Sequence, residues 1–308
     1  MKRTFIAGLL LVCLVLPAVA LGARGGSTVG VIVTRGTPFY EESYNALIKY
    51  VSRRSDIKFI LQRPYPDPVS WSNSARKLMA AEVDAIVTYG AAATFAAIRE
   101  NPGVPVIYAG LTGSAAGAVK AKNAAGVYSS LPVASLLRYL KEIKPTRTLG
   151  VLYDSMEADS AYQAAEITRV SREYGINPVK INLVKAGEAA SMLSGARMDA
   201  LYVTECATAG AAYQSVLGEM WGRKIPVASL ISDKQNSRQA LMTLSPDPEE
   251  QGQMAGKLLL QALERSSARG LGRLESRRFT LIYNYRDSAP MGLRISLGLV
   301  TEATQVIY

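Results

Sequence analysis

Two carboxylates, Asp159 and Glu205, are the side chains best placed to bind or transform a small molecule. Each follows a short apolar segment by a few residues, where loop side chains meet in α/β proteins. A pair of carboxylates facing one substrate would be sufficient for acid and base catalysis. A carboxylate opposite the free N–H groups of a helix terminus would instead suit a ligand with both an ammonium and a carboxylate group. We favour binding and expect no enzymatic activity.

Other chemistry is limited because the chain contains no histidine. The usual general base, the Ser-His and Cys-His nucleophile pairs and the commonest zinc ligand are therefore missing. The segment Gly252–Lys257 is similar to a phosphate-binding loop, but it is one residue short between its glycines, and Leu258 replaces the Ser or Thr that would bind magnesium. We interpret this segment as helix. We predict no catalytic residue, no metal site and no cofactor.

The elements that must position these residues are arranged as an internal repeat. Three short apolar segments of the first half recur in the same order about 120 residues later. They span residues 29–34, 83–88 and 104–107 and are matched by 149–154, 198–203 and 225–228. Helical patterns lie between them at 41–54, 69–81, 91–99, 158–174 and 207–221. This alternation predicts an α/β fold with two doubly wound parallel-sheet lobes and a ligand cleft between them.

The end of the chain indicates how the lobes are joined. A strong helical pattern at 246–265 and a strand pattern at 279–283 remain after both repeats are complete. We therefore expect a multi-crossover hinge, which suits closure around a ligand. The predicted lobe 1 comprises residues 28–124 and 247–278, and the predicted lobe 2 comprises residues 125–246 and 279–308.

Candidate ligand-binding residues directly follow the expected strands, because strand carboxyl ends and helix amino ends meet at one edge of a parallel sheet. In the first lobe they are Arg35, Tyr40, Tyr89, Ala91, Ala92, Thr94 and Thr112. In the second lobe they are Asp159, Ser160, Glu205 and Ser229. The N–H groups at the start of the helix at 91–99 could hold a carboxylate or phosphate, or that helix could only pack closely on a strand.

Several of these candidates have a structural alternative. Arg35 could pair with an anionic ligand or be an exposed loop residue. Asp159 and Ser160 could contact ligand or only cap a helix. Tyr40 and Tyr89 could stack on a planar ligand or belong to the core.

The amino terminus has the pattern of a secretory signal peptide. Lys2 and Arg3 precede an apolar run over residues 5–16, and small residues follow, so we expect a signal peptide at 1–23 with cleavage after Ala20 or Ala23. The apolar run is shorter than the roughly 20 residues that cross a bilayer. We therefore predict a periplasmic or otherwise extracytoplasmic protein. Cys206 would be its only thiol, which excludes an intrachain disulfide, and we expect it to be a small buried residue.

The chain is moderately basic, with a formal net charge of +10. Such a charge suits an anionic ligand, an acidic partner or anionic lipid. Nucleic acid is not expected as a partner, because the chain has no recognisable nucleic-acid motif. The densest basic stretch, at 265–278, is interpreted as a solvated loop. We expect a monomer.

With these segments identified, the chain resembles the type I periplasmic solute-binding proteins of ABC transporters, and more narrowly the branch that includes tryptophan- and tyrosine-binding members. The most specific stretches are Gly126–Pro132, Leu149–Tyr153, Glu157–Ser160 and Asn284–Ala289. Members of the branch often carry Asn-Ser where this chain has Asp159-Ser160, and Asp-Asn where it has Glu205-Cys206. The polar groups that would hold an amino acid are therefore altered.

The resemblance implies a function as well as a fold. It implies capture of an amino-acid-like or other small polar or aromatic solute in the interlobe cleft, and delivery to the membrane permease of an ABC importer. A ligand-sensing subunit for a membrane receptor or sensor kinase is an alternative from another class. A carboxylate-based enzyme, which would turn over the bound compound, is a third.

Overall fold

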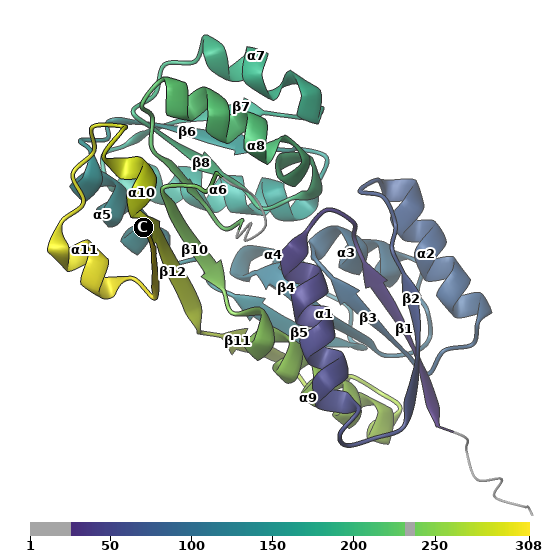
Figure 1. Ribbon diagram of the computed structural model, residues 1–308. Helices are drawn as coiled ribbons and strands as arrows, with labels where there is room; N and C mark the ends of the chain where they lie inside the picture. Colours follow the sequence, from purple (N-terminus) through teal and green to yellow (C-terminus); the bar gives the residue numbers. More distant parts are fainter. Residues whose placement is uncertain (1–25, 232–237) are drawn as a thin grey trace, which may run out of the picture.

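The computed structural model describes residues 26–231 and 238–308, which form two α/β lobes, lower and upper in Figure 1. The expected signal peptide at 1–23 lies outside the described residues. Within the described part of the chain, no helix is both long and apolar enough to cross a membrane.

The first lobe is built on a six-stranded sheet whose strands pair in parallel, in the order β11-β5-β4-β3-β1-β2. Its strands are β1 (Ser27–Val33), β2 (Ile57–Gln62), β3 (Ala85–Tyr89), β4 (Val106–Thr112), β5 (Ala124–Ser129) and β11 (Arg273–Ser276). Its helices are α1 (Pro38–Val51), α2 (Pro68–Ala80), α3 (Ala91–Arg99), α4 (Gly113–Ala118) and α9 (Pro248–Arg265).

Alternating side chains of β1 explain how this sheet is covered on both faces. Val31 packs with Leu47 of α1 and Leu258 of α9 on one face. Ile32, its neighbour, packs with Trp71 of α2 on the other. Successive side chains of a strand point to opposite faces, so a strand buried on both faces is apolar throughout.

The second lobe is built on a seven-stranded sheet in the order β13-β12-β10-β9-β8-β6-β7. Its strands are β6 (Thr148–Tyr153), β7 (Asn177–Asn182), β8 (Ala200–Val203), β9 (Val227–Ser229), β10 (Met242–Pro246), β12 (Phe279–Asn284) and β13 (Gln305–Ile307). Its helices are α5 (Val133–Ile143), α6 (Ala158–Glu173), a short 3-10 helix (Ala186–Glu188), α7 (Ala189–Ser194), α8 (Ala207–Gly222), α10 (Tyr285–Ser288) and α11 (Leu297–Glu302).

The internal repeat is visible in the sheet order. The run β4-β3-β1-β2 of the first sheet corresponds, strand for strand, to β9-β8-β6-β7 of the second. The predicted fold class, two doubly wound α/β lobes of the type I periplasmic binding kind, is confirmed. One pair departs from the expected parallel sheets, because β12 runs antiparallel to β10. The chain leaves the second lobe along β10 and returns along β12, so these two strands have opposite directions.

Two sequence-based expectations differ from the structure. The predicted boundary at residue 125 falls inside β5, which pairs with β4 and β11 and places Val127 in the core of the first lobe. The first crossing between lobes therefore follows Ser129. The basic stretch at 265–278, expected as a loop, contains β11.

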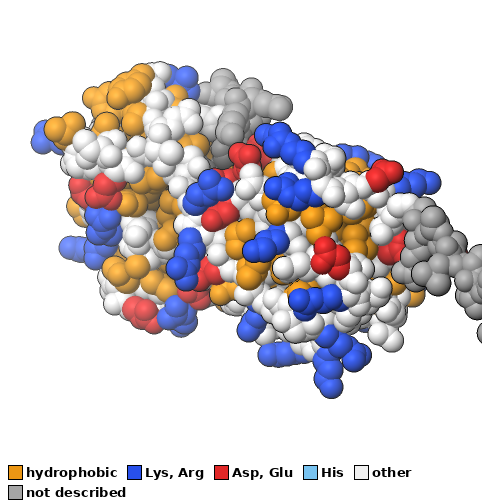
Figure 2. All heavy atoms as spheres, turned by 90° about the horizontal axis from the view of Figure 1, so that it is seen from below, with side chains coloured by type: hydrophobic (Ala, Val, Ile, Leu, Met, Phe, Trp, Pro, Cys, Tyr) orange, Lys and Arg blue, Asp and Glu red, His pale blue; other side chains and the backbone are white. Residues whose placement is uncertain are grey.

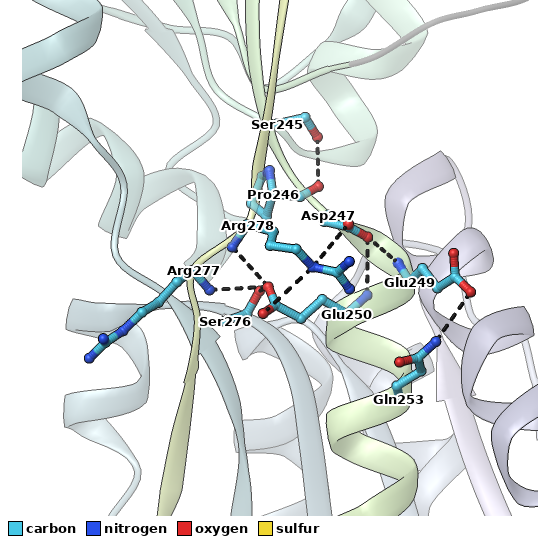
Figure 3. A network of polar contacts seen from close by, with 9 residues as sticks. All are labelled: Ser245, Pro246, Asp247, Glu249, Glu250, Gln253, Ser276, Arg277 and Arg278. Carbon is cyan, nitrogen blue, oxygen red and sulfur yellow. Dashed lines mark hydrogen bonds and ion pairs between the residues drawn. The ribbon is translucent and has the colours of Figure 1, made fainter. Parts of the chain in front are cut away.

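The second crossing leads from β10 to α9, and the third leads from β11 to β12. These two crossings lie side by side in the hinge and are joined by hydrogen bonds to Glu250 (Figure 3). One Glu250 carboxylate oxygen accepts hydrogen bonds from Ser276 Oγ at 2.7 Å and from the backbone N–H groups of Arg277 and Arg278 at 3.1 and 2.9 Å. The Arg278 side chain lies 3.4 Å from the carboxylate of Asp247, which caps α9. The start of α9 thus holds the return strand in place.

Candidate functional site

A cavity lies between the lobes, with an empty volume of about 310 Å³ that includes space open to solvent. The first lobe and the hinge segments contribute Phe39, Tyr40, Gly110, Leu111, Thr112, Ser129, Leu131, Pro246 and Gln251, and the second lobe contributes Gln163, Glu205 and Leu230. A second cavity of about 520 Å³ shares Phe39, Glu205 and Pro246 with the first, and it continues toward β10 and β12 of the hinge. Glu205 therefore lies where the two cavities meet.

Glu205 follows β8 and is positioned by a side chain of α6. Gln163 Oε1 accepts a hydrogen bond from the Glu205 N–H at 2.9 Å, and Gln163 Nε2 donates to the Glu205 carbonyl at 3.1 Å. The Glu205 side chain is only 7% exposed. Burial, together with the nearby charges of Asp159 and Glu42, raises the pKa of its carboxyl to about 8. Within the described part of the chain, Glu205 forms no ion pair with Lys or Arg.

Asp159, in the first turn of α6, reaches across to the other lobe. Its Oδ2 atom accepts a hydrogen bond from the Ala91 N–H at 2.6 Å, and the Tyr40 hydroxyl also bonds to this carboxylate. Its Oδ1 atom is buried without a hydrogen-bond partner. Burial raises the pKa of Asp159 to about 7, although the Ala91 and Tyr40 bonds act in the opposite direction.

The start of α3 was a candidate for binding a ligand anion, with close packing on a strand as the alternative, and a carboxylate of the protein occupies it. Ala91 lies at the first position of α3, directly after Gly90. Gly90 has a φ of +87°, and a Cβ placed on it would lie 2.8 Å from Asp159 Oδ2 and 2.6 Å from the Tyr40 hydroxyl. Only glycine allows this approach without strain. The anion site at Ala91 is thus filled from the opposite lobe.

Three of the predicted residues line the cavity: Tyr40, Thr112 and Glu205. Asp159 lies next to them through its contact with Tyr40. Ala91 and Ala92 lie in the first turn of α3, where their backbone N–H groups act on the Asp159 carboxylate.

Two predicted residues of the first lobe have structural roles instead. Tyr89 is fully buried and packs on Tyr44 and Tyr40, with ring centroids 6.3 and 6.4 Å apart. Thr94 donates through Oγ1 to the Gly90 carbonyl at 2.6 Å, which secures the first turn of α3.

Arg35 also lies away from the cavity. It is exposed, donates to the Arg63 carbonyl at 2.8 Å and lies over the Tyr65 ring at 4.7 Å. Arg35 is therefore an exposed loop residue, which was the alternative interpretation of its position.

The predicted serines of the second lobe connect strand ends. Ser160 Oγ accepts from the Asp154 N–H at 2.8 Å and lies 2.6 Å from Thr204 Oγ1. Ser229 Oγ donates to the Val203 carbonyl at 2.9 Å. Neither lines the cavity. The suggested capping of α6 is also wrong, because Glu157 occupies the N-cap position.

Glu157 and Cys206 organise the start of α8. The Glu157 carboxylate accepts from the N–H groups of Ala207 and Thr208 at 3.0 and 2.9 Å. Cys206 is the N-cap of α8, and its sulfur accepts from the Ala209 N–H at 3.4 Å. Burial raises the pKa of the Cys206 thiol well above its usual range, so the reactive thiolate is disfavoured.

Sequence reasoning did not identify two glutamines at the cavity. Gln251, at the start of α9, accepts from the Gly110 N–H at 3.0 Å and donates to Ser129 Oγ at 2.6 Å. Gln163 lies four residues after Asp159 on the same helix, so its place on the same face was a usable signal. No comparable signal existed for Gln251, because the hinge crossing brings it to the cavity.

Basic side chains are spread over the surface rather than gathered at this site. In the space-filling view of one face, Lys and Arg side chains alternate with Asp and Glu (Figure 2). Among the described residues, none that lines either cavity is basic.

The comparisons with known proteins agree with this architecture. The sequence profile of the family described as ABC transporter substrate binding protein matches residues 55–307. The chain therefore belongs to this family of ABC transporter substrate-binding proteins. No curated protein matches the chain in sequence.

Solved structures show the same fold at low sequence identity. A conserved domain protein from Vibrio cholerae has a TM-score of 0.83 and 18% identity, over 92% of this chain and 100% of the other. An ABC domain from Streptococcus pneumoniae in complex with L-Trp has a TM-score of 0.82 and 20% identity, with the same coverage. A solute-binding protein from Bacillus halodurans with bound myo-inositol has a TM-score of 0.61 and 16% identity, over 85% and 96%.

Proposed function

We propose that this protein captures a small solute in the interlobe cavity and delivers it to the permease of an ABC importer. The observation that carries this proposal is that both lobes line one cavity, with Tyr40 and Thr112 from the first and Glu205 from the second. A ligand that touches both lobes binds the closed arrangement more tightly than the open one, and so drives closure. Family membership supports the delivery step. The protein acts as a carrier without chemical turnover.

The ligand is not defined by the fold, because the similar structures contain compounds as different as L-Trp and myo-inositol. A thermal-shift screen of amino acids, amines, organic acids, nucleosides and sugars tests the proposal. A compound that binds only the folded state raises the melting temperature. We expect one class to do so and to be recovered unchanged after incubation. Failure of every class, or conversion of the bound compound, would contradict the proposal.

We also propose that residues 1–23 are a signal peptide that is cleaved on export, and that the mature protein works outside the cytoplasm as a monomer. Membership of the substrate-binding family and the pattern around Lys2 and Arg3 support this. Mass spectrometry of the protein from an extracytoplasmic fraction should give an amino terminus directly after Ala20 or Ala23. Recovery of the uncleaved chain in the cytoplasm would contradict it.

A further inference from the structure

We propose that the ligand of this cleft is a small organic cation, a protonated amine carried on an apolar group, that has no carboxylate of its own. This inference rests on the proposed function, since it names the class of solute that the cavity accepts. It depends on the charges that line the two cavities, on the occupied start of α3 and on the apolar walls.

The lining is acidic and contains no cation among the described residues. Glu205 lines both cavities, and none of the described residues that line them is Lys or Arg. A carboxyl group that is buried without a partner is costly to ionise, so it stays protonated until a cation pairs with it. Glu205 is more than nine-tenths buried and has no ion-pair partner among the described residues. A ligand ammonium group would supply that partner.

For a ligand carboxylate, by contrast, two backbone N–H groups of the first lobe that could act as donors are already bonded to side chains of the protein. The Ala91 N–H at the start of α3 is bonded to Asp159. The Gly110 N–H, which faces the cavity, is bonded to Gln251 Oε1. A zwitterionic ligand would have to bury its own anion beside Asp159 and Glu205, and like charges in a buried site disfavour each other strongly.

Much of the rest of the wall is apolar. Phe39, Leu111 and Leu131 line the cavity from the first lobe and the hinge, and Leu230 lines it from the second lobe. The polar groups that remain, such as Thr112 and Ser129, are neutral. The cavity thus offers one anionic end and an apolar body, which matches an amine on an alkyl or aryl group.

Isothermal titration calorimetry with matched pairs tests this inference. Each amine is compared with the amino acid that differs from it by one carboxylate: isobutylamine with valine, isopentylamine with leucine, phenethylamine with phenylalanine, and tryptamine with tryptophan. We expect at least one amine to bind about tenfold or more tightly than its amino-acid partner. Tighter binding by the amino acids overturns the inference.

The result also separates this inference from the proposed function. If myo-inositol or another uncharged solute binds and no amine does, the carrier function stands and the cation is excluded. If no compound of any class binds, both proposals fail.

Substitution of Glu205 gives a second, independent readout. Glu205→Gln keeps the size of the side chain and removes its charge, so amine affinity should fall about tenfold or more. The control is Glu264→Gln, which changes an exposed carboxylate of α9 and should leave the affinity unchanged. Thermal unfolding of both variants confirms that they are folded. Unchanged amine affinity in Glu205→Gln would overturn the inference.

Discussion

The carboxylate of Asp159 in the second lobe accepts a hydrogen bond from the backbone N–H of Ala91 in the first, with 2.6 Å between Oδ2 and N. This contact spans the cleft and joins the first turn of α6 to the first turn of α3. It involves a charged acceptor and a helix amino terminus, which is a favourable combination. It belongs to the closed arrangement of the lobes, because separation of α3 from α6 would break it.

Gly90→Ala should hinder this closure. The added methyl group would lie 2.8 Å from Asp159 Oδ2 and 2.6 Å from the Tyr40 hydroxyl, so the lobes could not approach as closely. We expect ligand affinity to fall about tenfold or more, and small-angle scattering to show a larger radius of gyration in the presence of ligand.

The matched control for Gly90→Ala is Gly175→Ala. Both glycines have a positive φ, +87° and +69°, so both substitutions strain the backbone, but a Cβ at Gly175 has no atom within 4 Å. Gly175→Ala should lower stability without changing ligand affinity. Equal affinities in the two variants would show that the contact at Gly90 does not control closure.

The stability of the ligand-free protein should depend on pH through its two buried carboxyls. Their pKa values are raised in the folded state, to about 7 for Asp159 and about 8 for Glu205. A raised pKa means that the folded state holds protons more tightly than the unfolded state. The resulting stabilisation is present at low pH and is lost as pH rises through those values. Among the described residues, the titratable groups that act on these two carboxyls are Tyr40, Glu157 and Glu42, none of which is a cation.

The difference between Glu205→Gln and the wild type isolates this effect, since the other titrating groups are shared. We expect the melting temperatures of the two proteins to be similar at about pH 5, and the variant to be the more stable one at about pH 9. Differential scanning calorimetry across this range provides the measurement. A difference that does not change with pH would contradict the raised pKa of Glu205.

Glu250→Ala should destabilise the hinge. The substitution removes the acceptor shared by Ser276 Oγ and the N–H groups of Arg277 and Arg278 (Figure 3). Because water can replace part of these bonds, we expect the free energy of unfolding to fall by about 1–2 kcal/mol. Urea denaturation measures this change.

Glu249→Ala is the control for the hinge, because Glu249 is adjacent on the same helix but makes only exposed contacts with Lys49 and Gln253. Its effect should stay below about 0.5 kcal/mol. The pKa of Glu250 is lowered, despite partial burial, by its bond to Ser276 and its other bonds across the hinge. The extra stability from Glu250 should therefore be lost as pH falls through that lowered pKa. Equal destabilisation by both substitutions would argue against a special role for Glu250.

Gly252→Ala should weaken the packing of α9 on α1. A Cβ at Gly252 would lie 2.6 Å from Ala46 Cβ and 2.8 Å from the Leu47 nitrogen, so the helices would have to separate. Overpacking of this kind costs about 1–3 kcal/mol, which thermal denaturation can detect. Gly187→Ala serves as the control, since a Cβ there has no atom within 4 Å. Equal stability of the two variants would contradict close packing between α1 and α9.

Much of the fold could be predicted because its main signals are local. Buried parallel strands such as β1 and β6 are mainly apolar, and their recurrence revealed two similar lobes. The end of the first lobe was misplaced because the apolar pattern of β5 does not show to which of the two sheets it belongs. Its membership depends on pairing with β4 and with β11, which lies far along the chain.

The site was predictable in part, because some of its residues are also marked by local signals in the sequence. Glu205 and Thr112 could be identified because they lie at or just after strand ends. Gln251 could not, because it reaches the cavity only through the second hinge crossing. Arg35 also follows a strand, but the carbonyl of Arg63 and the ring of Tyr65 hold it elsewhere. Position after a strand brings a residue near the cleft, and tertiary contacts decide where its side chain points.

The packing of α9 against α1, visible in Figure 1, also affects the order in which the chain can fold. Leu47 of α1 leaves the ribosome long before Leu258 and Leu259 of α9, its partners in the core of the first lobe. At synthesis rates of about 5–20 residues per second, the delay is roughly ten seconds or more. Throughout that interval the first lobe lacks one of the helices that cover its sheet. A nascent chain of this protein therefore presents uncovered apolar surface to chaperones until α9, which lies in the last third of the chain, has been made.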